Sequence, residues 1–376
     1  TPTAHTSNVV RCAQYVLGLS PDKVKFHRTP YSGGSFGGRG RADVDVEAML
    51  ISQKMNAPVH VLRSREEDIQ HENARPYTRS KLTAAVDKDG NLTAWKQKLV
   101  CQSINGTFLK EATMAPSVDY AKVREDNIKL MGAFMSSPYD FFAANATPAV
   151  PPYNNIPNIH VETVTVDGPM GVSHWRSVGK SGGIWIEEAF VDELAEAAKM
   201  DPVAFRRKAF ANNPRALAVL DRITKEVKWQ PINWGKKPNG SGWGIAYTDM
   251  GYGAMGAIAI QLSVDAKKKI SIKRIVSVTD QGVTVNPDIT HAQVQGGIID
   301  GLSSTMYGQL TVKGGGSLQQ IQTNFDINGN QIIVQHTYAN DDPGSFAGQT
   351  KTVTAEVQQL LPQQEITYEG IIQLAA

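Results

Sequence analysis

The feature that most constrains this chain is a glycine-rich stretch near its N-terminus. Residues 31–40 read YSGGSFGGRG, so five of the ten are glycine, and the aromatic Phe36 lies among them. Backbone without side chains can come close to a large group, and an aromatic ring offers that group a flat apolar face. The stretch therefore predicts a loop that receives a bound group.

The flanking patterns predict where this loop lies. Apolar residues at helical spacing predict helices over 9–17 and 44–55, while the short apolar runs 24–27 and 59–62 read as strands. The glycines would then lie between a strand and the N-terminus of a helix. Unpaired N–H groups and the helix dipole favour a phosphate or another anion at such a position.

Two common nucleotide-binding patterns do not fit the loop. The Walker A pattern needs Lys and then Ser or Thr after its last glycine, whereas Gly38 is followed by Arg39 and Gly40. The dinucleotide fingerprint G-x-G-x-x-G is also missing from this stretch. A tight turn without a ligand and a nucleotide-binding module of another kind stay open at this point.

The rest of the chain predicts helices and strands in alternation. The predicted elements are a hairpin over 81–100 with its turn at 87–90, a strand over 158–166, helices over 184–200 and 202–210, strands over 256–264 and 270–278, and a helix over 290–307. Asp201 and Pro202 are predicted to begin the second of those helices.

Three further stretches are interpreted by composition. Residues 134–157, rich in Pro, Asn and aromatics, predict a long ordered loop or a lid, and residues 229–242 predict an interdomain linker. The basic triplet at 206–208 is predicted to serve the helix dipole and solubility, as basic residues at helix ends commonly do.

Length and charge limit the class of protein. A chain of 376 residues predicts two or three domains, and a net charge of +2 without a basic block among aromatics argues against a nucleic-acid partner. Cys12 and Cys101 lie in apolar patterns and predict buried thiols. No apolar run predicts a membrane span. Because the chain begins without Met, it is expected to be processed or partial.

Four blocks in the same order carry a family resemblance. They are residues 33–39, residues 58–67, the group formed by 175–179, 188–195 and 201–207, and residues 280–308. Together they resemble the molybdenum-binding large subunit of the xanthine oxidase family, in particular its isoquinoline 1-oxidoreductase β-subunit and aldehyde dehydrogenase branch. The likeness runs from about residue 1 to 345. Since family large subunits are longer, the chain resembles their C-terminal half, and an N-terminal half is an expected partner.

The resemblance implies a fold and a chemistry. The implied fold is α+β, with two molybdopterin-binding domains, 1–235 and 236–376, whose mixed sheets are packed by helices. The implied cofactor is a molybdenum-bearing molybdopterin, in its cytosine dinucleotide form. The implied reaction oxidises aldehydes to carboxylic acids with oxygen from water, and hydroxylation of N-heterocycles is the alternative.

The resemblance also implies partners and a location. Two cysteines cannot hold iron and sulfur, so electrons are expected to leave through 2Fe-2S clusters on a small subunit, with a cytochrome c subunit as a further partner. A periplasmic or membrane-associated location is favoured by the resemblance, and a cytoplasmic one stays open.

The resemblance also implies roles for single residues of this chain. Phe36 and Gly37 match the family's loop beside the metal, and Arg176 matches an arginine on the cofactor side, whose guanidinium gives fixed donors to phosphate or pterin. Trp175 and Val178 are expected to flank the substrate cavity. No direct protein ligand to the metal is expected. The cofactor-binding residues implied in this way are Gly34, Ser35, Phe36, Gly37, Gly38, Arg39, Arg176, Gln293, Gly296 and Gly297.

The chain departs from the family at two positions. Gly348 stands where the family has its general base, a glutamate, and Ala4 or His5 stands where the family has a glutamine. Glu356, in a segment that reads as helix, is the nearest later carboxylate and the candidate base. Three explanations stay open: an inactive homologue, a different base, or a stretch after Ser345 that departs from the natural sequence. The last is favoured because the divergence begins abruptly there.

Overall fold

The computed structural model divides the chain into two compact units. Unit 1 comprises Thr1–Arg79, Leu99–Pro148 and Thr163–Gly179, and unit 2 comprises Ser80–Lys98, Ala149–Glu162 and Lys180–Ala376. The residues that the structure describes are 3, 6–27, 29, 34–40, 42–64, 73–102, 104, 153, 155–166, 172–178, 180–234, 240–249, 254–313, 317–325, 331–337 and 352–358.

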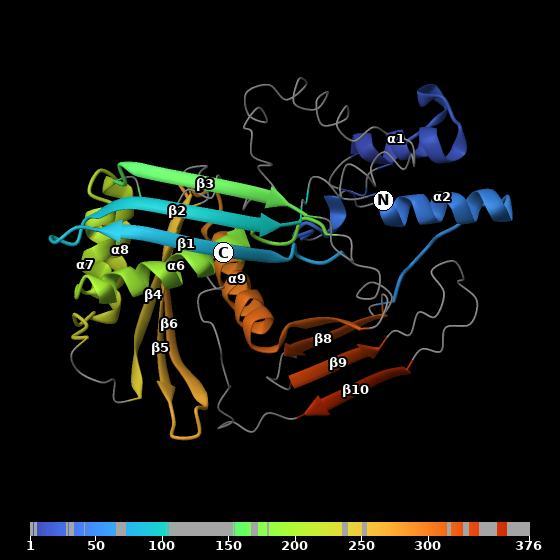
Figure 1. Ribbon diagram of the computed structural model, residues 1–376. Helices are drawn as coiled ribbons and strands as arrows, with labels where there is room; N and C mark the ends of the chain where they lie inside the picture. The colour runs from blue at the N-terminus through green and yellow to red at the C-terminus, as the bar shows by residue number, and fades with distance from the viewer. Residues whose placement is uncertain are drawn as a thin grey trace. The chain divides into compact units, whose positions relative to one another are not determined.

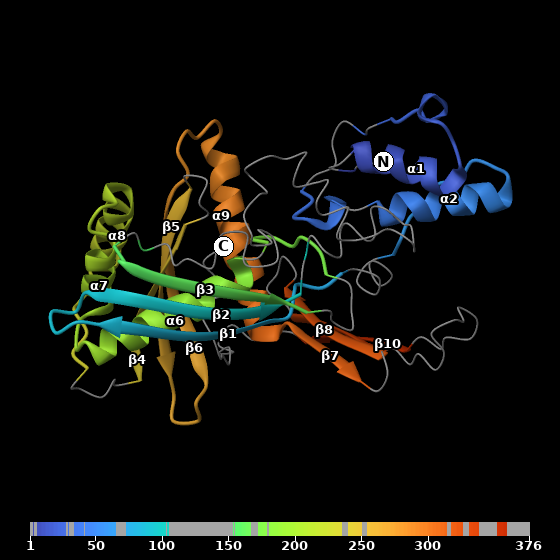
Figure 2. The ribbon, with the colours of Figure 1, turned by 45° about the horizontal axis from the view of Figure 1, so that its top comes forward.

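Unit 1 contains two helices that lie side by side, α1 (Thr6–Leu17) and α2 (Asp43–Met55) (Figures 1 and 2). Both were predicted, and both are confirmed. Gly18 follows α1 with φ of +65°, and Asn56 ends α2 in the left-handed conformation. The buried apolar residues of the pair are Val9, Cys12, Ala13 and Val46.

The two strands predicted around these helices are wrong. Residues 24–27 and 59–62 are irregular backbone, and Leu62 is 85% exposed. A strand is stable only with a neighbour that completes its hydrogen-bond ladder. No pairing involves these two segments within the described part of the chain, so a short apolar run alone was an insufficient signal.

Three strands form the first sheet, in the order β1 (Thr78–Val86), β2 (Leu92–Cys101) and β3 (Asn158–Thr165). The first two form the predicted hairpin. Its turn is closed by Asp87, whose carboxylate accepts hydrogen bonds from the backbone N–H groups of Asp89 and Asn91 at 2.9 and 2.8 Å. The predicted hairpin and the third strand are therefore confirmed.

Unit 2 contains three consecutive helices, α6 (Lys180–Ala197), α7 (Pro202–Ala209) and α8 (Pro214–Val227). α6 begins four residues before its predicted start, and α8 was not predicted. Asp201 caps α7 as predicted, since one carboxylate oxygen accepts from Val203 N and Ala204 N at 3.0 Å. Its other oxygen accepts from Trp229 Nε1 and Ile232 N at 3.0 and 2.9 Å.

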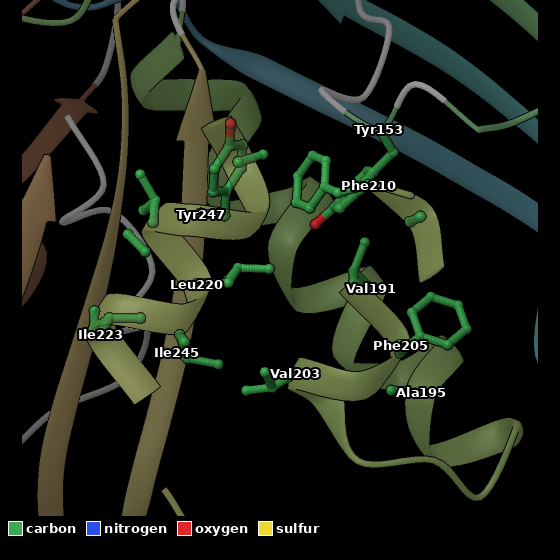
Figure 3. Packing of buried hydrophobic residues seen from close by; sticks show 14 of the residues in the cluster. Tyr153, Val191, Ala195, Val203, Phe205, Phe210, Leu220, Ile223, Ile245 and Tyr247 are labelled. Atoms are coloured by element: carbon green, nitrogen blue, oxygen red, sulfur yellow. The ribbon is translucent and has the colours of Figure 1, made fainter. Parts of the chain in front are cut away.

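An antiparallel sheet packs against α8. Its strands are β4 (Ser241–Asp249), β5 (Met255–Val264) and β6 (Ile270–Asp280), of which β5 and β6 contact α8. β4 begins inside the segment predicted as a linker. In the core of unit 2 the ring of Phe210 lies 4.7 Å from that of Tyr153 and 4.4 Å from that of Tyr247, measured between centroids (Figure 3).

The last part of the chain holds α9 (Pro287–Tyr307) and a four-stranded sheet in the order β10-β9-β8-β7 (Figures 1 and 2). The strands are β7 (Gln309–Lys313), β8 (Ser317–Phe325), β9 (Gln331–Thr337) and β10 (Thr352–Gln358). Glu356 lies in β10 opposite Ile333 of β9, so its predicted helical setting is wrong. Gly348 lies outside the described residues.

The predicted α+β class is confirmed, because the described elements comprise both helices and β-sheets. The domain boundary at 235/236 stays a prediction. Most of the predicted loop or lid at 134–157 lies outside the described residues. Both cysteines are buried and form no disulfide, as predicted. Within the described residues, no helix is long and apolar enough to cross a bilayer.

A buried charge network corrects one prediction. Arg206, expected to serve solubility, is fully buried and donates from Nε to Glu188 at 3.0 Å and from Nη1 to Asp192 at 2.6 Å. Glu188 also accepts from Tyr247 N at 2.7 Å and from the hydroxyl of Tyr153. The helix end turns Arg206 inward, where pairing compensates for its desolvation. Only its neighbours in the triplet reach the surface.

Candidate functional site

The glycine-rich loop of unit 1 places an aromatic ring at the surface. Phe36 is 50% exposed and has φ of +45°, and Gly37 follows it with φ of +103°. Gly38 N donates to Ser35 O at 2.9 Å, which closes the turn. Arg39 lies in a one-turn 3-10 helix, Gly38–Gly40. The loop therefore presents a flat ring beside nearly bare backbone.

A second tight turn in unit 1 carries the predicted arginine. Val178 N donates to Trp175 O at 2.7 Å, and Ser177 and Val178 have φ of +66° and +49°. A β-branched residue such as valine is a genuine outlier at positive φ, because its side chain crowds the backbone. The turn containing Arg176 is therefore strained.

Backbone strain among the described residues gathers at this site. Seven non-glycine residues have positive φ, and four of them end helices or occupy a hairpin turn: Asn56, Lys199, Lys228 and Lys268. The other three are Phe36, Ser177 and Val178. Such conformations cost about 1–3 kcal/mol each and persist where the surroundings fix them, commonly at functional sites.

The loop and the turn meet through two contacts. The guanidinium carbon of Arg176 lies 4.9 Å from the centroid of the Phe36 ring, which is a cation–π contact. A Cβ atom on Gly37 would lie 1.7 Å from the carbonyl oxygen of His174, so only glycine allows this approach. The sequence reasoning expected the glycines to make room for a ligand, and at Gly37 the room is taken by the chain's own backbone.

A third segment of unit 1 supports the turn. Ala74 and Val172 form a parallel bridge, and Ser173 N donates to Ala74 O at 3.1 Å. The indole N–H of Trp175 donates to the carbonyl of Asn73. Arg75 donates to the carbonyl of Arg176 at 2.6 Å. Sequence reasoning missed this segment, because neither periodicity nor composition distinguishes residues 73–75.

These residues fit a planar, anionic group. Arg39 and Arg176 supply cations in one unit, Phe36 supplies a flat face, and the glycine loop supplies backbone with few side chains. The hydroxyl of Ser173, next to the turn, is buried without a hydrogen-bond partner, so a polar donor or acceptor is available beside the site. Molybdopterin, with its pterin rings and phosphate, is such a group.

The structure places the predicted site residues in two groups. Gly34, Ser35, Phe36, Gly37, Gly38 and Arg39 lie in the loop of unit 1, and Trp175, Arg176 and Val178 lie in its turn. Gln293, Gly296 and Gly297 lie in α9 of unit 2, where Gly297 is buried and Gln293 is exposed. Glu356 lies in β10 of unit 2. Roles for the residues of unit 2 stay predictions.

Unit 2 holds buried titratable residues that are not among the predicted site residues. Burial raises the pKa of the Glu187 carboxyl, although the positive charge of Lys180 opposes the rise. Burial also lowers the pKa of Lys180. One oxygen of Glu187 has no hydrogen-bond partner. Within the described residues, no three His, Cys, Asp or Glu side chains gather in a way that could hold a metal ion.

Two family models match the chain. Both are described as a molybdopterin cofactor-binding domain, and they match residues 1–123 and 188–325. Together they span the glycine loop, the second half of α6, α7 and most of the elements that follow. The cofactor implied by the sequence resemblance is therefore the one named by both models.

Two relatives of the chain are named as oxidoreductases. The chain is 26% identical over 301 residues to isoquinoline 1-oxidoreductase subunit beta of Brevundimonas diminuta, covering 80% of this chain and 35% of that protein. It is 25% identical over 311 residues to a protein of Gluconacetobacter polyoxogenes named membrane-bound aldehyde dehydrogenase (pyrroloquinoline-quinone), covering 76% of this chain and 37% of that protein. The chain thus spans about a third of the length of these relatives.

Solved structures show the same fold at low identity. Quinoline 2-oxidoreductase from Pseudomonas putida 86 matches with a TM-score of 0.61 and 12% identity, over 84% of this chain and 61% of that one. CO dehydrogenase from Oligotropha carboxidovorans matches with a TM-score of 0.57 and 13% identity, over 82% and 60%. By its two domain models and its named relatives, the chain belongs to the molybdopterin-binding subunits of the xanthine oxidase family.

Proposed function

We propose that this chain is part of the catalytic subunit of a molybdenum hydroxylase that oxidises aldehydes to carboxylic acids with oxygen from water. The observation that carries the proposal is the contact of Arg176 with Phe36 at the glycine loop. It joins two of the residues that the family resemblance assigned to the cofactor, although they lie far apart in the sequence. The named aldehyde dehydrogenase relative supports the choice of substrate class.

The residues of this chain bind and orient. The guanidinium of Arg176 offers donors in a fixed plane to phosphate or pterin, and Phe36 offers an apolar face next to it. The tight packing of Gly37 on His174 fixes the loop relative to the turn. When bound, the molybdenum cofactor supplies the two-electron oxidation of the substrate carbon. Trp175 and Val178, on the same turn, are proposed to flank the substrate.

One of the two departures from the family lies at the general base. It suggests an alternative to an active enzyme. Gly348 replaces the family's glutamate in the sequence, and Glu356 is proposed as the base in its place. General base catalysis is worth about two to four orders of magnitude in rate. A chain without any base would be a homologue that binds the cofactor but turns over slowly.

A second substrate class is favoured by a different observation. The relative from Brevundimonas diminuta is named for isoquinoline, an N-heteroaromatic compound, and it matches a larger share of this chain than the aldehyde dehydrogenase does. We therefore keep N-heteroaromatic hydroxylation as the alternative activity. Isoquinoline and a small aldehyde, tested in parallel on the same preparation, separate the two.

The remaining features of the proposed enzyme come from the family resemblance. We propose the cytosine dinucleotide form of the cofactor, electron transfer to a small subunit with 2Fe-2S clusters, and a cytochrome c subunit as a further acceptor. Several relatives are named as subunits, which supports an assembly of several chains. A periplasmic or membrane-associated location is proposed with them.

The test measures bound cofactor and turnover on the full-length protein as isolated with its partners. Bound molybdenum with pterin, together with aldehyde-dependent reduction of a dye, is the expected result. Molybdenum without turnover on either substrate class would select the cofactor-binding homologue. A bound nucleotide such as ATP, with no pterin, would overturn the proposal and select a nucleotide-binding module.

A paired substitution tests the missing base. Gly348→Glu restores the carboxylate that the family carries at this place, and it is expected to raise kcat by about two orders of magnitude or more if the base is missing. Gly344→Glu, four residues earlier, is the matched control and should leave kcat unchanged. Loss of activity on Glu356→Gln, with no gain from Gly348→Glu, is the result expected if Glu356 is the base, as proposed.

A further inference from the structure

One arginine that is not among the predicted site residues contacts the turn that carries Arg176. Residues 73–75 run alongside residues 172–176 in unit 1, joined by the bridge between Ala74 and Val172. Arg75 is the member of this segment whose side chain reaches the turn itself. It donates from Nη1 to the carbonyl of Arg176 at 2.6 Å.

The guanidinium of Arg75 has a second contact on the same turn. Its central carbon lies 5.5 Å from the centroid of the Trp175 ring, within the range of a cation–π contact. A single planar group thus contacts the ring of Trp175 and the backbone of Arg176. The indole of Trp175 is also held by its hydrogen bond to the carbonyl of Asn73, in the same segment.

The turn needs such support because its backbone is strained. Ser177 and Val178 both have positive φ, and conformations of this kind persist only where surrounding contacts fix them. The carbonyl of Arg176 accepts two hydrogen bonds, from Arg75 and from the hydroxyl of Ser177 at 2.5 Å. The bond from Arg75 is charge-assisted and comes from a distant part of the chain, so it is the stronger constraint.

We propose that Arg75 is a positioning residue that holds the 175–178 turn so that the Arg176 guanidinium stays over the Phe36 ring. Its charge acts through the backbone of Arg176 and the ring of Trp175, without contact to a bound group. The role in retaining the cofactor rests on the proposed function, whereas the role in holding the turn does not. Lysine would serve poorly here, because an ammonium lacks the flat face and the fork of donors that meet both partners.

The first test needs no cofactor. Amide hydrogen exchange over residues 172–178 is followed by mass spectrometry in the wild type, Arg75→Ala, Arg75→Lys and Arg79→Ala. Arg79 is the matched control, because it is an exposed arginine that lies four residues later, in β1. Loss of a charged hydrogen bond is expected to speed exchange in the turn about tenfold in Arg75→Ala, with a smaller rise in Arg75→Lys. Arg79→Ala should match the wild type.

The result that overturns the proposal is wild-type exchange in the turn of Arg75→Ala. If that variant fails to fold, Arg75→Lys decides: exchange in the turn faster than in Arg79→Ala supports the proposal, and exchange equal to it overturns it.

The second test measures molybdenum per protein and kcat per bound molybdenum in the same variants. Arg75→Ala is expected to lower molybdenum content about tenfold relative to Arg79→Ala, with kcat per bound molybdenum unchanged. Lower kcat at full molybdenum content would overturn the positioning role in cofactor retention. A wild type without molybdenum would contradict the proposed function, while the exchange experiment would still decide whether Arg75 holds the turn.

Discussion

Two arginines illustrate how differently the two units use charge. Arg206 of unit 2 is fully buried and ion-paired with Glu188 and Asp192, so its charge is neutralised within the core. Arg176 of unit 1 lies over a half-exposed phenylalanine on a strained turn. The first arrangement fixes a fold, and the second places a guanidinium against the aromatic ring of the glycine loop. Burial and the type of neighbouring group therefore distinguish the two arginines.

The largest effect is expected at the buried pair. Arg206→Ala leaves Glu188 as an uncompensated buried charge, which should lower the free energy of unfolding by about 3–5 kcal/mol. Arg207→Ala is the control, since its ion pair with Asp221 is partly exposed and should change stability by about 1 kcal/mol or less. Chemical denaturation measures both. Equal effects of the two substitutions would break the comparison.

The next effect is expected at the contact between loop and turn. Gly37→Ala places a Cβ atom 1.7 Å from the carbonyl oxygen of His174 and strains a residue at φ of +103°, so the loop must move from the turn. A cost of about 1–3 kcal/mol and a clear loss of bound molybdenum are expected.

The matched control for that substitution is Gly282→Ala. Gly282 has φ of +78°, but a Cβ atom added there would meet no atom within 4 Å, so this position carries the strain without the collision. Thermal unfolding and metal analysis on both variants make the test. Molybdenum retained in Gly37→Ala would show that the loop and turn need not touch for cofactor binding.

A smaller effect is expected at Glu187, a buried carboxylate of which one oxygen has no hydrogen-bond partner. Its pKa is raised by burial from 4.5, so the folded state binds the proton more tightly than the unfolded state. The stability it contributes is therefore present below about pH 4.5 and is lost as pH rises through the folded pKa. Lys180, Glu188 and Gln97 are the groups that act on it.

Glu187→Gln removes that dependence. It should raise stability at pH 7 by on the order of 1 kcal/mol and leave it nearly unchanged at pH 4, as measured by urea denaturation at both values. A variant less stable than the wild type at pH 7 would indicate that the Lys180 pair outweighs the desolvation of Glu187.

The smallest effect on stability is expected from Phe36→Leu. It removes a cation–π contact worth about 0.5–1 kcal/mol at an exposed site and keeps most of the apolar volume. The melting temperature should barely change, while molybdenum content should fall more than in a surface control such as Tyr77→Leu, a 71% exposed aromatic of the same unit. A melting temperature that falls as far as in Gly37→Ala would assign Phe36 to packing.

Periodicity predicted most of the helices, because an apolar face at 3.6-residue spacing reports burial directly. α1, α2, α6, α7 and α9 were all found within a few residues of their predicted bounds. The helix α8 was missed although its signals are present in the sequence: Asn213 caps it, Pro214 begins it, and its buried residues recur at helical spacing. This helix could therefore have been predicted.

Other misses could not have been avoided from sequence alone. The runs 24–27 and 59–62 look like strands, and whether a run becomes one depends on a distant neighbour. Glu356 became part of a strand through its pairing with β9, which local propensity does not report. The burial of Arg206 and the contacts of Arg75 depend on tertiary packing. The meeting of Phe36 with Arg176 was expected only through the family resemblance.

Asp201 has a consequence for the order in which unit 2 forms. Its two carboxylate oxygens join the start of α7 to Trp229 and Ile232, so one side chain closes a stretch of about thirty residues that contains α7 and α8. Contacts over such short separations form quickly, because little chain entropy is lost in closing them. The pair of helices α7 and α8 is thus suited to form first. Strands that follow in the chain can then pack against it.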